Sequence, residues 1–156
     1  MSGSGRPAGV IDGRGISLAI VTASWHEEIC GNLRSQALAA AADCGAICSV
    51  DVRVPGALEL AVVAQAAARR DDVDAVVALG VVIRGGTPHF EYVCTTSSDA
   101  LSHVALNSGV PVANGVLTCD TFEQAYDRDG RDGAAENKGY DAALAAIATA
   151  LTLRGL

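Results

Sequence analysis

The segment Val73-Asp-Ala-Val-Val-Ala-Leu-Gly-Val-Val82 is the most hydrophobic stretch of the sequence, and it decides the fold class. A short apolar run of this kind is typical of a strand that is buried on both faces of a parallel sheet. Similar apolar runs occur at Ile16–Ala23, Ile47–Val54 and Val112–Thr118. Helical patterns separate the four runs, so we predict an α/β domain with a parallel sheet and right-handed crossovers.

The helical patterns follow each strand in turn. Apolar or small residues recur at helical spacing from His26 to Cys44, and Gly45 is a suitable stop signal. Further helices are predicted from Leu58 to Arg69, from Phe90 to Val104 and from Tyr140 to Leu151, and Asp120–Thr121 before Glu123–Gln124 is a predicted helix cap. Four βα units in series, without a linker or a repeat, indicate one domain.

Composition excludes several classes of protein. The chain has 156 residues, of which 50% are hydrophobic and 19% charged, so extended disorder is excluded. The 29 alanines and 17 valines favour close packing of helices on a sheet. The net charge of −7 argues against a nucleic-acid partner. Apolar stretches are too short to span a membrane.

The first fifteen residues are rich in Gly and Ser and contain no apolar core of a signal peptide. We therefore predict a flexible N-terminal arm over residues 1–15, a domain over residues 16–156, and no export. The odd number of cysteines and the absence of a Cys-x-x-Cys pair favour reduced, mostly buried thiols and a cytoplasmic location. These cysteines are Cys30, Cys44, Cys48, Cys94 and Cys119.

Ligands of open parallel sheets bind beyond the carboxyl ends of the strands. We assign Ser24–Trp25, Pro55–Glu59 and Val81–Phe90 to these ends, together with Asn114 of the fourth strand. Unusual residues gather there: the only Trp, an acid that opens a helix, and a Gly-rich turn that ends in a histidine.

The turn Ile83-Arg-Gly-Gly-Thr-Pro-His89 is the strongest local signal. Two glycines let the backbone approach a ligand, and the N–H groups before a helix favour an anion. The spacing matches neither a P-loop nor a dinucleotide motif. Phosphate binding and an ordinary strand–helix turn both stay open. His89 is a candidate for proton transfer near neutral pH.

The other histidines have plainer interpretations. His103 lies inside a predicted helix and is expected on the surface, and His26 is expected to cap a helix or face solvent. The sequence contains no His/Cys spacing typical of a metal site, and no nucleophile elbow.

Trp25 and Glu59 each have two interpretations. The Trp is either a core residue or a platform for a flat heterocycle. The Glu either complements the helix dipole or accepts hydrogen bonds from substrate hydroxyls. Lys138 is the only lysine, and a cation at a helix start opposes the dipole, which favours a functional role. Arg128 ends the preceding helix, where a cation is favourable in any case.

Taken together, these segments resemble the lumazine synthase family of riboflavin biosynthesis, and especially its actinobacterial members, which carry Trp at the stacking position. The resemblance runs from about Ile16 to the C-terminus. The matching segments are Ala19–Trp25 (AIVTASW), Val54–Glu59 (VPGALE), Ala78–Tyr92 (ALGVVIRGGTPHFEY), Ala113–Thr118 (ANGVLT), Glu123–Arg128 (EQAYDR) and Asn137–Gly139 (NKG).

The resemblance implies a three-layer αβα sandwich with the flavodoxin-like strand order 2-1-3-4. It implies an enzyme that joins 5-amino-6-ribitylaminouracil to 3,4-dihydroxy-2-butanone 4-phosphate without any cofactor or metal. The product is 6,7-dimethyl-8-ribityllumazine, with loss of phosphate and water. It also implies a homopentamer whose active sites lie between subunits, with the N-terminal arm adding a strand to a neighbour's sheet.

The same resemblance assigns roles to individual residues. His89 is implied to move protons during imine formation and phosphate loss. Trp25 is implied to stack on the pyrimidine, and Glu59 to accept hydrogen bonds from the ribityl chain. Residues implied to bind the ribityl-pyrimidine are Trp25, Ala57, Leu58, Glu59, Val81, Val82, Ile83, Asn114 and Lys138, and those implied to bind phosphate are Gly86, Thr87 and Arg128.

The loop Asp129–Glu136 is longer than the compact turn of capsid-forming members, which favours an isolated ring over a shell. Asp127 and Asp129 flank Arg128 and are expected to soften its field, and Arg131 is an alternative phosphate ligand. Two rival functions stay open: an archaeal-type riboflavin synthase, and a catalytically silent binding or shell protein with the same fold.

Overall fold

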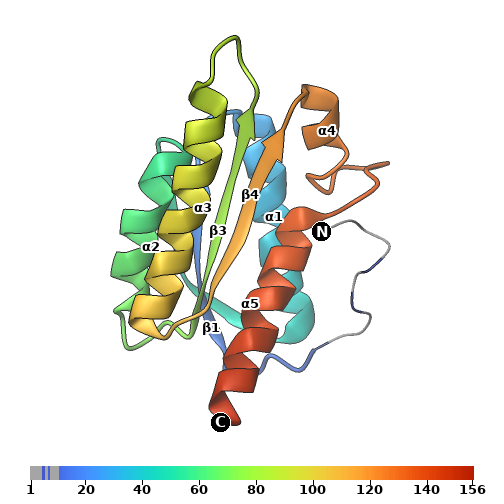
Figure 1. Ribbon diagram of the computed structural model, residues 1–156. Coiled ribbons are helices and arrows are strands. Elements are labelled where there is room, and N and C mark those ends of the chain that lie inside the picture. Colours follow the sequence, from blue (N-terminus) through green and yellow to red (C-terminus); the bar gives the residue numbers. More distant parts are fainter. Residues whose placement is uncertain (1–4, 6, 8–10) are drawn as a thin grey trace.

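Four parallel strands form the sheet of the computed structural model, which describes residues 5, 7 and 11–156 (Figure 1). The order β2-β1-β3-β4 confirms the predicted order 2-1-3-4. The strands are β1 (Ser17–Ala23), β2 (Ile47–Val54), β3 (Ala75–Ile83) and β4 (Val112–Cys119). The third strand begins two residues later than predicted, because the Val73 amide still donates to the Arg70 carbonyl in the preceding turn (3.3 Å).

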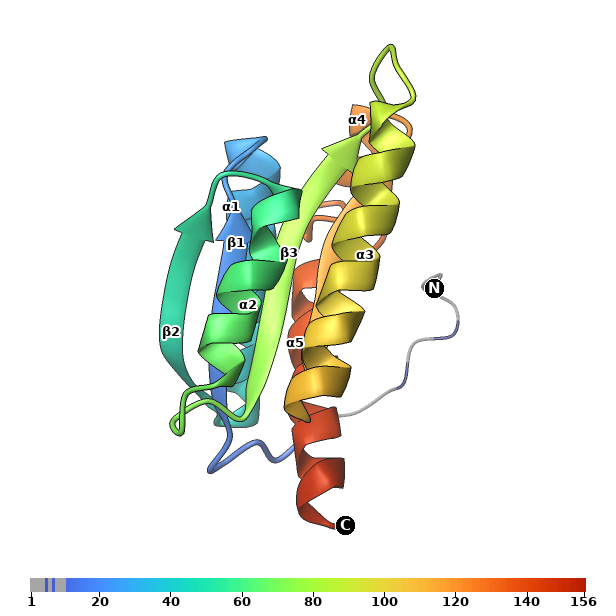
Figure 2. The same ribbon diagram turned by 60° about the vertical axis from the view of Figure 1, so that its left-hand side comes forward.

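Helices cover both faces of the sheet, which confirms the three-layer sandwich (Figures 1 and 2). The pair α1 and α5 packs on one face, and the pair α2 and α3 packs on the other. Their bounds are α1 (Glu27–Cys44), α2 (Leu60–Ala68), α3 (His89–Ser108) and α5 (Lys138–Arg154), with two shorter helices, η2 (Ala57–Glu59) and α4 (Phe122–Tyr126). The predicted second helix is thus a 3-10 turn followed by a shorter α-helix.

Small side chains let the layers approach closely. Every residue of β1 is buried, as are the first seven of β3. A β-carbon at Gly139 would lie 2.2 Å from the Leu33 carbonyl oxygen, so the start of α5 contacts the backbone of α1 directly. A β-carbon at Gly115 would lie 2.5 Å from Leu79 Cδ2. The abundance of alanine and glycine therefore fixes the thickness of the core.

The predicted helix signals are confirmed in part. Gly45 ends α1 in the left-handed conformation, with its amide donating to Ala41 and Ala42, and Thr121 Oγ1 caps α4 by accepting from the Gln124 amide. His103 is exposed, as expected. His26 occupies the N-cap position of α1, but its side chain makes no capping hydrogen bond, and its half-buried ring meets the Phe122 ring edge-on at 5.2 Å.

The predicted N-terminal arm falls largely outside the described residues. Its last part approaches the domain, because Gly13 is buried and its amide donates to the Cys44 carbonyl (2.7 Å). All five cysteines are free, three buried and two half-buried. None of the helices that the structure describes is both long and apolar enough to cross a membrane.

Candidate active site

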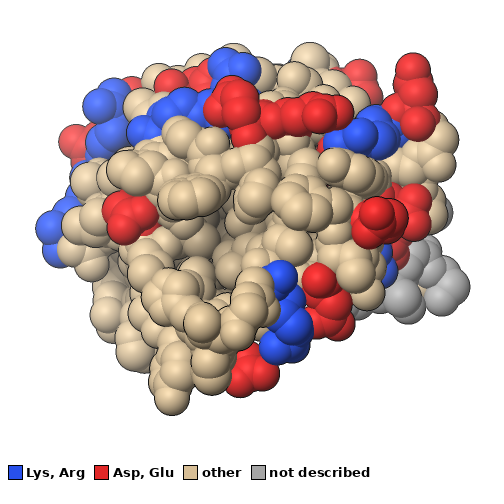
Figure 3. Space-filling view, turned by 90° about the horizontal axis from the view of Figure 1, so that it is seen from above, with Lys and Arg blue, Asp and Glu red and all other residues tan. Residues whose placement is uncertain are grey.

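The carboxyl edge of the sheet collects most of the candidate residues. Trp25 follows β1, the η2 turn follows β2, and the Gly-rich turn leads from β3 into α3. Seen from above, this edge is hollowed near its centre, where the surface is uncharged, and charged side chains stand around it (Figure 3).

Trp25 is 69% exposed and so is not a core residue. Its indole lies beside Gly56, where a β-carbon would come within 3.1 Å of Trp25 Cδ1. Glu59 Oε2 accepts a hydrogen bond from the Gly56 amide (2.8 Å) and would lie 3.2 Å from the same β-carbon. The indole and the carboxylate therefore share one small space that the missing side chain at Gly56 leaves open. Ala57 is half-buried and Leu58 is exposed on the same turn.

The end of β3 presents backbone groups to this edge. Pairing of β1 with β3 stops at Thr22 and Leu79, whereas β4 pairs with β3 as far as Ile83. The backbone of Val81, Val82 and Ile83 therefore runs beyond the end of the β1–β3 ladder. The Val76 and Arg84 amides donate to Pro111 and Cys119 on the β4 side, so by alternation Val82 also faces β4, and Val81 and Ile83 face the side where β1 has ended. Backbone amide and carbonyl groups on that side suit a heterocycle that both donates and accepts hydrogen bonds.

The turn from Gly85 to His89 is fully exposed and rises above the sheet (Figure 1). A β-carbon at Gly85 or Gly86 would meet nothing within 4 Å. His89 is the first residue of the 20-residue helix α3, and its amide reaches only a long contact with Thr87 Oγ1 (3.4 Å). The helix therefore begins with N–H groups directed at open space, which favours an anion there.

Arg84 lies next to this turn, but its guanidinium is already paired with two carboxylates of the same chain. Its guanidinium contacts Asp120 (2.7 Å) and Glu91 (3.2 Å) and lies 4.4 Å from the centre of the Phe90 ring. The hydrogen bonds that Arg84 donates to Asp120 and Glu91 raise its pKa. An anion at the turn thus needs its cation from another part of the protein.

The prediction that Asn114 lies at a carboxyl end was wrong. In the strand register it pairs with Ala78, five positions before the pair Ile83–Cys119, or about 16 Å from the edge at the usual strand rise. Its amide group contacts Ser98 of α3 (3.3 Å), and its side-chain oxygen accepts from the Val116 amide. It is an exposed residue of the edge strand β4, on the face that α3 covers.

Arg128 and Lys138 meet at one carboxylate. Glu136 Oε2 lies 3.4 Å from Arg128 Nε, and Glu136 Oε1 lies 3.5 Å from Lys138 Nζ. Arg128 also donates to the Gln124 carbonyl (2.8 Å), near the end of α4. Glu136 thus contacts both cations, and the sequence analysis did not identify it as a site residue. Its position two residues before the only lysine is the feature of the sequence that could have indicated it.

A buried carboxylate anchors the same loop. Asp129 is completely buried, and it accepts hydrogen bonds from Asn32 Nδ2 (2.9 Å) and from Arg131 Nη2 (2.7 Å) and Nε. Burial raises the pKa of this carboxyl, but the bonds from Arg131 and Asn32 outweigh burial, and the pKa is lowered. Arg131 also contacts Glu28 (3.2 Å) and lies over the Tyr126 ring.

These contacts distinguish the two arginines, Arg128 and Arg131, that the sequence offers as ligands of the phosphate. Asp129 was expected to soften the field of Arg128, but its charge is paired with Arg131, and the carboxylate beside Arg128 is Glu136. Since Arg131 is committed to Asp129, Arg128 is the better candidate for a substrate anion.

The candidate residues thus form two groups. One is the open edge with Trp25, Glu59 and His89, and the other is the loop with Arg128 and Lys138, which leads into α5 on the α1 face, while Asn114 faces α3. Within the described residues, no three His, Cys, Asp or Glu side chains come together in a group that could hold a metal ion.

Comparisons with known proteins show the family of this chain. The family model described as 6,7-dimethyl-8-ribityllumazine synthase matches residues 15–154. Proteins of that name from Thermobifida fusca and Frankia casuarinae are 53% and 55% identical to this chain; both alignments cover 100% of it, and 91% and 98% of the respective relatives. The protein of that name from Kocuria rhizophila is 53% identical to this chain, and the alignment covers 98% of this chain and 99% of the relative. The chain therefore belongs to the 6,7-dimethyl-8-ribityllumazine synthase family.

Proposed function

We propose that this chain joins 5-amino-6-ribitylaminouracil to 3,4-dihydroxy-2-butanone 4-phosphate and forms 6,7-dimethyl-8-ribityllumazine in riboflavin biosynthesis. The observation that carries the proposal is the family match, which covers residues 15–154. The joining of an amine to a carbonyl needs positioning and proton transfer more than a strong nucleophile, and no cofactor.

The pyrimidine is proposed to stack on Trp25, whose indole is exposed directly after the carboxyl end of β1. Glu59 is proposed to accept hydrogen bonds from the ribityl hydroxyls, because only one of its oxygens is used by the Gly56 amide. The backbone of Val81 and Ile83, on the side where β1 has ended, is proposed to meet the polar edge of the ring, and Ala57 and Leu58 are proposed to meet the carbons of the ribityl chain.

The phosphate is proposed to bind at Gly86 and Thr87, where the start of α3 offers N–H groups and a hydroxyl. His89 stands at the same place and is proposed to exchange protons with the carbonyl and the departing phosphate. Arg128 is proposed to supply the guanidinium that this turn lacks.

We further propose that Asn114, Arg128 and Lys138 complete the site of a neighbouring copy in a homopentamer. They come from β4 and from the segment that follows it in the chain, whereas Trp25 and Glu59 follow β1 and β2. Exposed apolar side chains on α2 and α3 support such an association, namely Val62 (67%), Tyr92 (71%) and Leu106 (82%). Pairing of a neighbour's N-terminal arm with a sheet edge, an isolated ring, and the cytoplasmic location stay predictions.

The test is a direct assay with the two substrates. Growth of lumazine absorbance with release of one phosphate per product supports the proposal. Consumption of added lumazine with formation of riboflavin would identify a riboflavin synthase instead. Tight binding of the ribityl-pyrimidine without any product would identify a silent binding protein.

A further inference from the structure

The loop that joins β1 to α1 carries Trp25 in a conformation that needs support. It consists of Ser24, Trp25 and His26, and His26 has a φ of 57°, the one positive φ of a non-glycine residue in the part of the chain that the structure describes. Such a conformation is unfavourable for a side chain of this size and persists only where surrounding contacts fix it.

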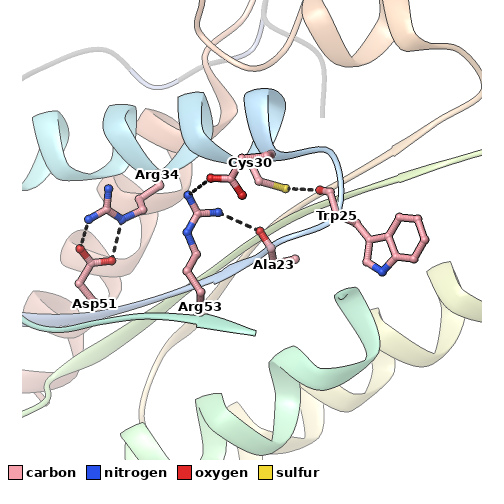
Figure 4. Close-up of polar contacts among 7 residues, drawn as sticks. Ala23, Trp25, Cys30, Arg34, Asp51 and Arg53 are labelled. Carbon is pink, nitrogen blue, oxygen red and sulfur yellow. Dashed lines mark hydrogen bonds and ion pairs between the residues drawn. The ribbon is translucent and has the colours of Figure 1, made fainter. Parts of the chain in front are cut away.

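One side chain joins the two ends of this loop (Figure 4). Arg53 comes from the neighbouring strand β2, and its Nη1 donates to the carbonyl of Ala23, the last residue of β1 (3.1 Å). Its Nη2 donates to Oε1 of Glu27, the first residue of α1 (3.0 Å). A single guanidinium therefore fixes the residues immediately before and after the loop.

The middle of the loop is held through its backbone. Cys30 Sγ donates to the Trp25 carbonyl (3.0 Å), and the Ser24 amide donates to the Pro55 carbonyl (3.2 Å). The indole itself extends away from α1 into the open (Figure 4). The direction of the ring therefore depends on how firmly the loop is held.

We infer that Arg53 is a positioning residue, which holds the Trp25 indole in place for a flat heterocycle by clamping Ala23 to Glu27. The inference rests on the proposed stacking role of Trp25 and adds a residue outside the proposed site. Arg53 is the group that reaches both ends of the loop, and its side chain is only 33% exposed. An exposed ion pair with Glu27 alone would contribute little, so the contact with the Ala23 carbonyl is essential to the argument.

The chain offers a matched control. Arg34 of α1 also joins α1 to β2, through two contacts with Asp51, and its side chain is 35% exposed. It touches no residue of the loop in Figure 4. Arg53→Met and Arg34→Met therefore remove guanidinium groups of equal exposure between the same two elements, and only the first releases the loop.

The lone tryptophan gives a direct measurement. We expect Arg53→Met to shift the wavelength of the Trp25 fluorescence maximum and to make the fluorescence anisotropy of Trp25 decay faster. We expect Arg34→Met to leave both quantities unchanged. We expect the KM for the ribityl-pyrimidine to rise about 10-fold in Arg53→Met, with kcat and the KM for the phosphate substrate near wild type. Arg53→Lys keeps a positive charge but lacks the two guanidinium nitrogens that contact Ala23 and Glu27 together, so we expect it to restore the KM only in part.

Three outcomes would overturn the inference: unchanged fluorescence in Arg53→Met, an equal response of both Met variants, or a uniform loss for both substrates. Where Arg53→Met fails to fold, Arg53→Lys keeps the cation but cannot reach the Ala23 carbonyl and Glu27 at the same time, and it is expected to give a smaller shift in the same direction; no shift rejects the clamp. An unchanged pyrimidine KM in Trp25→Ala would reject the stacking role itself, while fluorescence still decides whether Arg53 holds the loop.

Discussion

The turn around His89 stands open, whereas the cations at Arg128 and Lys138 already have partners within their own chain. The turn is fully exposed and its glycines meet no neighbouring atom. The loop from Arg128 to Lys138 is tied together by Glu136 and anchored by the buried Asp129. One region has N–H groups without a cation, and the other has cations without an open anion site.

This difference teaches that the two regions contribute to the proposed reaction in different ways. The turn carries His89, the group proposed to move protons, so changes to that histidine are expected to act on rates. A loop held by ion pairs is organised beforehand, so changes there are expected to act on affinity and on stability. The predictions below test this division.

The largest expected effect is on the rate of the reaction. His89→Ala is expected to lower kcat by about 10²–10⁴-fold, or roughly 3–5 kcal/mol at the barrier, because general acid–base help is lost. Binding of the ribityl-pyrimidine should stay near wild type. His103→Ala, an exposed histidine of the same helix, is the control and should change neither quantity. An unchanged kcat across neutral pH would remove His89 from the mechanism.

The next largest effect is expected on the stability of the fold, at the buried Asp129 in the loop from Arg128 to Lys138. Asp129→Ala is expected to lower the free energy of unfolding by about 3 kcal/mol at pH 7, because the buried pair with Arg131 is broken. The pKa of Asp129 is lowered in the folded state, so its contribution is present above about pH 4 and is lost as the pH falls below that value.

Urea unfolding at pH 7 and pH 3 measures this contribution. The difference between wild type and Asp129→Ala should shrink at pH 3. The exposed pair of Asp72 and Arg70 has the same spacing of two residues and provides the control, since Asp72→Ala should change stability little. A difference that is equally large at both pH values would contradict the ion-pair account.

A smaller effect is expected on the affinity for the phosphate substrate. Arg128→Ala removes a charge-assisted contact worth about 1.5–3 kcal/mol, so this KM should rise about 10- to 100-fold. The KM for the ribityl-pyrimidine should change much less, and competition by inorganic phosphate should weaken in parallel. An equal loss for both substrates would indicate damage to the loop rather than a lost ligand.

The smallest effect is expected beside the indole. Gly56→Ala places a β-carbon 3.1 Å from Trp25 and 3.2 Å from Glu59, and this crowding is expected to cost about 1 kcal/mol. The KM for the ribityl-pyrimidine should rise several-fold, since both groups must shift. Steady-state kinetics with each substrate varied in turn measures it, and a selective rise for the phosphate substrate would contradict this geometry.

Sequence patterns predicted the fold because each strand and helix has strong periodicity of its own. The parallel α/β sheet is as the patterns predicted, the strand order and both helix layers are as the resemblance implied, and Gly45 and Thr121 act as the predicted helix signals. The fourth strand was predicted to within one residue, and that run already placed Asn114 near its amino end. The assignment of Asn114 to the carboxyl edge was therefore an error of interpretation, which the strand register corrects.

Charge pairing in the candidate site could not be read from the chain. Asp129 and Glu136 are both acids close to Arg128 in sequence, yet only tertiary contacts with Asn32 and Arg131 bury the first and leave the second beside the cation. Likewise, nothing local marks Arg53 as the residue that spans the β1–α1 loop from another strand. Long-range partners of charged residues leave no periodic signal.

The most direct test of a site shared between copies is complementation by two inactive variants. His89→Ala and Arg128→Ala chains, tagged differently, are denatured together at equal amounts and refolded, and mixed oligomers are isolated by both tags. In a closed ring with random mixing, about one contact in four pairs two intact halves, so about a quarter of wild-type activity should return. Mixed oligomers that form and stay as inactive as either variant alone would contradict the shared site.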